Sequence, residues 1–177
     1  MPLILSGDTG PSFVQDAAMP AGSVLQVVQA YKTDVFSTTS TSAFVDITGL
    51  SVSITPISAS NRILVMANLA DCSTTAALGD GMFQVLRNST AVGNGDNGGT
   101  APVMAYVNTY LAATNTMTDS VVFNFLDSPA TTSSTTYKVQ CRLWSNVGTT
   151  GTLLVGRRAE NASFISPSSI TVMEIAA

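Results

Sequence analysis

The chain has 177 residues, of which only 7 are Lys or Arg and 11 are Asp or Glu, and its formal net charge is −4. It contains no histidine, which excludes Ser-His and Cys-His dyads, an imidazole general base and zinc bound through imidazole. The cations are scattered, and only Arg157 and Arg158 adjoin, so the sequence predicts no groove that follows a nucleic-acid backbone.

This scarcity of charge predicts self-association. A compact monomer of this size exposes about 8,100 Å² of surface, and soluble surfaces usually carry about a quarter to a third charged residues. Ser, Thr, Asn and Gly must cover the remainder, or another subunit must. Because large exposed apolar patches normally mark interaction sites, we expect copies of the chain to bury part of their surface against one another.

Residues 1–22 combine chain breakers, at Pro2, Gly7, Gly10, Pro11 and Pro20, with apolar side chains. We predict that they form an extended arm that docks on a neighbouring subunit or on another protein; the alternative is a disordered terminus. The arm would make its contacts through Leu3, Ile4, Leu5, Phe13 and Val14.

The same segment does not resemble a signal peptide, because it has no basic region and its apolar run spans only Leu3–Leu5. No apolar stretch approaches the 18 residues that a membrane helix requires. We therefore expect a protein that is made in a cytoplasm and is not inserted into a membrane.

Residues 23–177 are predicted to form β-strands almost throughout. Leu50, Val52 and Ile54 alternate with polar residues, and the segment Tyr137–Trp144 does the same, which indicates half-buried strands. Continuous β-rich runs indicate strands that are covered on both faces. These runs are Val24–Tyr31, Ile63–Leu69, Met82–Leu86, Val121–Leu126, Leu153–Val155 and Ser169–Ile175.

Turn residues separate these runs. Pro56, Pro129 and Pro167 stand where strands should end, and Val103–Ala113 is compatible with either a helix or a strand. Short strands at this spacing predict an all-β fold, a jelly-roll-like antiparallel β-sandwich of residues 23–177. Glycine-containing pairs with positive-φ positions are expected at Thr48–Gly49, Asp80–Gly81, Asn94–Gly95, Asn97–Gly99 and Val147–Gly148.

One glycine-rich segment matches a nucleotide-binding pattern. Gly93–Gly98 has the spacing of the dinucleotide fingerprint, but Gly99–Pro102 follows it and cannot open the helix that holds a pyrophosphate. The segment also lacks the acidic spacing of a calcium loop. We interpret Gly93–Gly99 as a β-turn loop and leave open whether it binds an ion.

Two aspartate pairs are formal candidates for glycosidase chemistry, Asp71 with Asp80 and Asp119 with Asp127. Each aspartate lies beside turn residues, where local backbone hydrogen bonds favour Asp, so we predict structural roles and a protein that is not an enzyme. Trp144 and Tyr110 are candidates for stacking on a sugar, although such rings more often belong to the core.

Two cysteines, Cys72 and Cys141, lie far apart in the sequence, which does not indicate a disulfide framework, and the sequence leaves their pairing open. We predict no cofactor and no metal.

Six longer segments carry a family resemblance. They are Val24–Val27, Phe44–Pro56, Leu86–Gly93, Phe125–Pro129, Thr136–Gln140 and Ile170–Ile175. Together they resemble the C-terminal β-sandwich domain of tail-fibre-like virion structural proteins of phages, especially those that infect cyanobacteria. The resemblance covers residues 24–177 and brings no catalytic or binding residues with it.

The resemblance implies a trimeric phage structural protein located in the virion. We expect a short tail fibre or receptor-binding subunit that contacts tail or baseplate proteins, with a host surface glycan as a candidate ligand. The family usually places this domain after a long shaft, whereas here about 22 residues precede it. That difference favours, as the alternative, a capsid decoration (cement) protein whose arm grips the major capsid protein; a monomeric carbohydrate-binding module is the second alternative.

Overall fold

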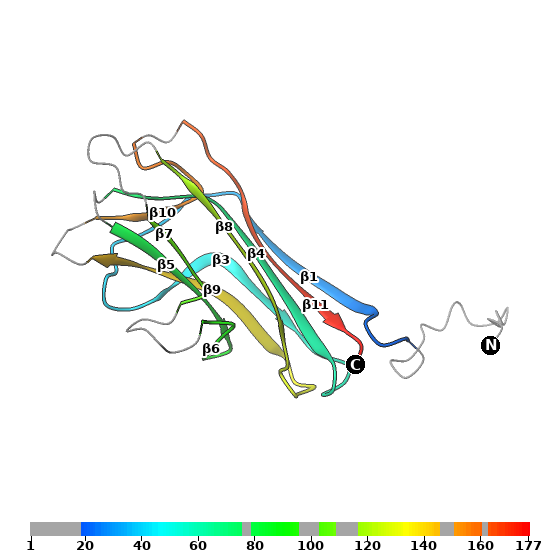
Figure 1. Cartoon of the computed structure of the whole chain (residues 1–177). Helices are drawn as coiled ribbons and strands as arrows, with labels where there is room; N and C mark the ends of the chain where they lie inside the picture. The colour runs from blue at the N-terminus through cyan, green and yellow to red at the C-terminus, as the bar shows by residue number, and fades with distance from the viewer. Residues whose placement is uncertain (1–18, 76–78, 96–102, 109–116, 146–150, 161–162) are drawn as a thin grey trace.

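The structure of the chain is a computed structural model that describes residues 19–75, 79–95, 103–108, 117–145, 151–160 and 163–177. These residues form β-strands and connecting loops, with no helix among them (Figure 1). The strands are β1 (Val24–Lys32), β2 (Phe36–Thr38), β3 (Val45–Ile54), β4 (Arg62–Thr74), β5 (Gly79–Arg87), β6 (Thr90–Val92), β7 (Ala105–Asn108), β8 (Asp119–Asp127), β9 (Thr135–Ser145), β10 (Leu153–Val155) and β11 (Ser168–Ile175).

The strands form two antiparallel sheets with the strand order of a jelly roll. One sheet has the order β1-β11-β4-β8 and is extended beyond β4 by β10 and β2; the other has the order β3-β9-β5 with β6 and β7 beside β5. Apart from the three-residue strands β2, β6 and β10, the first strand pairs with the last, the second with the seventh, the third with the sixth and the fourth with the fifth. A long hairpin rolled up in this way is a jelly roll, which confirms the predicted fold class.

The core lies between the two sheets and is built by alternating side chains. Leu50, Val52 and Ile54 on β3 are buried, while the serines between them are exposed. On β9, the core-facing side chains from Tyr137 to Leu143 are fully buried. They pack with apolar side chains of the opposite sheet in one continuous cluster. The period-two patterns of the sequence are therefore confirmed at both strands.

The continuous apolar runs were expected to be covered on both faces, and for three strands that expectation is wrong in the single chain. Val27 on β1, Met66 on β4 and Val122 on β8 point away from the core and are 55%, 40% and 65% exposed. The opposite sheet covers only the inner face of these strands, and among the described residues nothing covers the outer face.

Two of the predicted turns are also corrected, because Thr48–Gly49 and Asp80–Gly81 lie inside β3 and β5. Gly49 has a φ of 89° at a bulge where β3 leaves the register of β9, and its Cα faces the side chain of Lys32. At Gly81, an added Cβ would lie 2.6 Å from Leu153 Cδ1 and 2.9 Å from a methyl of Val107. Gly49 is therefore needed at a bulge and Gly81 at a close approach between strands, and neither lies in a chain reversal.

The beginning and end of the sandwich are tied together. The Gly22 amide donates to the Ala176 carbonyl and the Ala176 amide donates to the Ser23 carbonyl, both at 2.9 Å. The predicted arm contacts, Leu3, Ile4, Leu5, Phe13 and Val14, lie outside the described residues, and the arm stays a prediction.

Several other predictions are settled only in part. Ala105–Asn108 is a strand, whereas residues 109–113, including Tyr110, lie outside the described residues, as do residues 96–102 of the glycine-rich loop. Pro56 and Pro129 lie just beyond the ends of β3 and β8, as predicted, whereas Pro167 immediately precedes the start of β11. Within the described ranges, the chain has no helix that is long and apolar enough to cross a membrane.

Candidate interaction surfaces

An arginine in contact with two aromatic rings lies on the outer face of β9. The guanidinium carbon of Arg142 lies 5.0 Å from the ring centre of Phe44 and 4.9 Å from that of Trp144. Arg142 Nη1 donates to the Thr41 carbonyl at 3.2 Å, while its Nε is buried without a hydrogen-bond partner in the described structure. Cation–π attraction to the two rings restrains the guanidinium.

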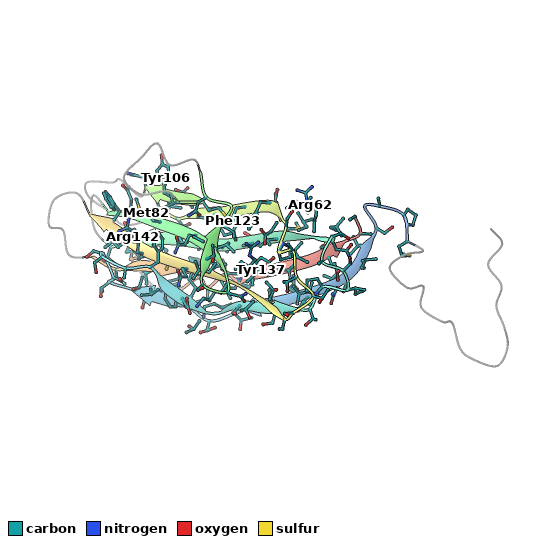
Figure 2. The ribbon with its side chains drawn as sticks, turned by 90° about the horizontal axis from the view of Figure 1, so that it is seen from below. Arg62, Met82, Tyr106, Phe123, Tyr137 and Arg142 are labelled. Atoms are coloured by element: carbon teal, nitrogen blue, oxygen red, sulfur yellow. The ribbon has the colours of Figure 1, made fainter. Side chains whose placement is uncertain are left out.

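Strand register extends this cluster across the sheet. Met82 on β5 is opposite Arg142, and Tyr106 on β7 is opposite Met82, so all three share the outer face. Tyr106 is 66% exposed. Figure 2 shows these three labelled residues near one another, with Arg62 toward the other end of the molecule. We call Phe44, Met82, Tyr106, Arg142 and Trp144 the arginine–aromatic cluster.

A ladder of polar side chains borders the cluster. Gln84 Nε2 donates to Gln140 Oε1 at 2.7 Å, and Gln140 Nε2 donates to Asp46 Oδ1 at 2.6 Å. Lys138 Nζ lies 2.7 Å from Asp46 Oδ2, and this hydrogen bond lowers the pKa of Asp46, with Gln140 contributing in the same direction. The ladder therefore presents fixed amide and carboxylate groups with balanced charge beside the aromatic rings.

Sequence reasoning found only part of this surface. The alternation in Tyr137–Trp144 places Arg142 and Trp144 on the same face of a strand, and that signal was available. The general preference of aromatic rings for the core was misleading for Trp144, which lies on the outer face and is half-buried. Phe44 was missed because its contact with Arg142 spans about a hundred residues of sequence.

The aspartate pair Asp119 and Asp127 is not brought together. These residues begin and end β8, so eight steps of about 3.4 Å separate them by about 27 Å, well beyond the roughly 9.5 Å of paired glycosidase carboxylates. Asp127 instead accepts from Arg87 Nη1 at 2.8 Å and from the Tyr137 hydroxyl at 2.6 Å. Burial and this bond to Asp127 raise the pKa of Tyr137, so its hydroxyl remains a donor. The three side chains join β8 of one sheet to β5 and β9 of the other.

The second pair also serves separate structural sites. Asp71, at a bulge of β4, accepts hydrogen bonds from Thr118 and Ser166. Asp80 accepts from Asn108 Nδ2 at 2.5 Å. Both aspartates lie within strands and accept from side chains of distant segments, which corrects the predicted turn location and the predicted local backbone hydrogen bonds.

The two cysteines are free thiols buried in the core. Burial raises the pKa of Cys141 to about 12, and burial together with the neighbouring Cys141 raises that of Cys72 further. Within the described ranges, no three His, Cys, Asp or Glu side chains gather as metal ligands would.

Comparisons with known proteins are limited to the fold. No protein-family model matches the chain, and no curated protein matches it. The chain is similar to a structure of the infectious bursal disease virus Gt strain, with 17% identity and a TM-score of 0.44. The alignment covers 99% of this chain and 47% of the viral chain. The VP2 subviral particle of the same virus aligns at 17% identity and a TM-score of 0.40 over 46% of its chain. The chain thus spans about half the length of these structures.

Proposed function

We propose that the chain is a structural protein of a phage particle, a homotrimeric short tail fibre or receptor-binding subunit exposed on the particle surface. The observation that carries this proposal is the sequence resemblance over residues 24–177, together with a strand order that agrees with it. Jelly rolls occur in viral capsid and lectin domains. Because a fold alone does not establish a function, the surfaces must supply the remaining support.

The arginine–aromatic cluster supports an exposed recognition role. Trp, Tyr and Arg are the residue types that most often dominate binding energy at interfaces. Here they lie together on one face, with Tyr106 largely exposed and Arg142 already held in place. A rigid cluster loses little conformational entropy when it binds. We therefore assign receptor contact to this end of the sandwich.

Location in the particle separates this function from its nearest alternative. Antibodies against the recombinant chain, applied as immunogold to particles of the phage that encodes it, should label the tail. Labelling spread over the head would replace the fibre with a decoration protein whose arm holds the capsid shell. Absence of label, and of the chain's peptides from purified particles, would remove both placements.

A carbohydrate-binding module is the second candidate, favoured by the exposed ring of Tyr106 beside fixed amide groups. Sugars stack on exposed aromatic rings and are oriented by a few polar groups nearby. Affinity electrophoresis in gels containing host surface polysaccharide should show retardation of the chain. Tyr106→Ala should abolish the retardation, whereas Phe164→Ala, which removes a ring that is 68% exposed outside the arginine–aromatic cluster, should not.

A further inference from the structure

The outer face of the β1-β11-β4-β8 sheet carries a row of apolar side chains across all four strands. Register places Val27 opposite Met173, Met173 opposite Leu64 and Leu64 opposite Leu126. Paired residues point to the same side of a sheet. Since the neighbours of Met173 along β11, Val172 and Glu174, are buried in the interior, this row points outward. We call this outer surface the apolar face.

The apolar face concentrates the exposed hydrophobic surface of the molecule. Of the twelve large apolar side chains that are exposed in the described part of the chain, six lie on it. They are Val24, Val27, Tyr31, Met66, Val122 and Leu126. The strands that carry these side chains have the continuous apolar sequences that are typical of strands covered on both faces. In the single chain, however, the fold covers only one face of each strand. The sequence of these strands thus predicts a second covering layer.

Charge and size identify that layer as another copy of the chain. Arg62 is the one charged residue among the described residues that point outward on these four strands. A partner rich in charge would therefore have to bury its charged side chains against this face without oppositely charged side chains to pair with them. The surface of this chain, with 7 basic and 11 acidic residues in 177, is comparably poor in charge. Four strands about 4.8 Å apart and seven paired residues at about 3.4 Å give the face roughly 450 Å² in plan. This is about half of the ~800 Å² that one partner contributes to a standard interface.

We infer that the apolar face packs against a neighbouring copy of the chain in the assembled oligomer. This inference rests on the oligomer in the proposed function and names the surface that forms it. In a ring of three copies the contact is heterologous, so this face of one copy meets a different surface of the next.

Sedimentation velocity of the full chain and two matched variants tests the inference. Val27→Glu and Ile165→Glu each place a carboxylate where a side chain is 55% exposed, but Ile165 lies outside the apolar face. We expect the wild type and Ile165→Glu to sediment as oligomers, and Val27→Glu to associate at least tenfold more weakly. Circular dichroism checks that each variant is folded.

Methionine oxidation gives a readout that needs no variant. In the wild-type oligomer, peroxide should oxidise Met66 much more slowly than Met117, although the two are 40% and 49% exposed in the single chain. If Val27→Glu does not fold, the protection of Met66 from peroxide in the wild type decides whether the apolar face is covered in the oligomer.

The outcomes separate this inference from the proposed function. A wild-type chain that is monomeric at micromolar concentration overturns both the inference and the trimer. An oligomer that withstands Val27→Glu and leaves Met66 as reactive as Met117 overturns the inference alone. Equal dissociation by the two variants also overturns it, because added charge rather than this face would then be responsible.

Discussion

Thr118, which immediately precedes β8, donates a hydrogen bond from Oγ1 to Asp71 Oδ1 at 3.0 Å. The other carboxylate oxygen accepts from the Ser166 hydroxyl, just before β11. Asp71 has a φ of 45° at the point where β4 leaves β8 and continues toward β10. One side chain thus fixes three chain segments where the larger sheet turns, and Asp is among the few residues that tolerate this backbone conformation.

Replacing this carboxylate should destabilise the fold. Asp71→Ala removes both hydrogen bonds and places a methyl group at positive φ, so we expect the free energy of unfolding to fall by about 2–4 kcal/mol. Asp71→Asn tolerates the backbone and keeps one acceptor, so its loss should be about half as large. Urea unfolding monitored by circular dichroism measures both, and equal losses would contradict this account of Asp71.

Glu174 anchors the opposite end of the same sheet. Its carboxylate is fully buried and accepts from the Ile57 amide and Asn61 Nδ2, each at 2.7 Å, and from Gln26 Nε2. Glu174→Gln points an amide group at donors that need an acceptor, and we expect a loss of about 2–4 kcal/mol. The control Glu160→Gln changes an exposed residue with a 3.8 Å ion pair and should cost less than about 0.5 kcal/mol. Similar losses for the two variants would show that Glu174 is not an anchor.

Gly81 is required by packing between strands rather than by a turn. Gly81→Ala would place a methyl group against Leu153 and Val107, and we expect a loss of about 1–3 kcal/mol from overpacking. At Gly95 the nearest atom to an added Cβ is 3.9 Å away, so Gly95→Ala should be nearly neutral. Combining Gly81→Ala with Leu153→Ala should cost less than the sum of the single losses, because the second change makes room for the first. Strict additivity in thermal or urea unfolding would rule out the steric explanation.

The same residues show what the sequence could predict. Alternation and strand-ending prolines depend on local patterns, and they were sufficient for the β-sandwich and for the buried side of β3 and β9. The reason for Gly81 lies on β10 and β7, and the reason for Gly49 is a φ of 89° at the bulge where β3 leaves the register of β9. Local patterns assigned both to turns, because a glycine at a bulge or at a close approach looks the same in the sequence as a glycine in a turn.

The candidate surfaces were less predictable for a related reason. A run such as Val24–Tyr31 indicates how much apolar surface a strand presents, but not whether its own chain or another copy covers the second face. Likewise, the role of Arg142 depends on Phe44 and on the register between β5 and β9. These features arise from pairing between distant segments, which neither composition nor local spacing determines.

The buried thiols make the stability of the fold sensitive to alkaline pH. In the unfolded chain, Cys72 and Cys141 ionise near the ordinary pKa of about 8.5, whereas the folded chain raises the pKa of Cys141 to about 12 and that of Cys72 further. Above pH 8.5 the unfolded state therefore binds fewer protons than the native state, and stability falls as pH rises. Below that pH both states hold the protons, and the thiols contribute no pH dependence.

The expected size of this effect follows from two groups that titrate in the unfolded state alone. Between pH 8.5 and pH 10, the wild type should lose about 3 kcal/mol more than the Cys72→Ala, Cys141→Ala double variant, since each fully ionised group contributes about 1.4 kcal/mol per pH unit and each thiol is half ionised at pH 8.5. Urea unfolding at pH 7, 8.5 and 10 with a phosphine reductant measures the difference, and the pH 7 values isolate the packing cost of the substitutions. Parallel pH profiles would mean that the thiols ionise in the native state, in which case an aromatic disulfide reagent should also label them without denaturant.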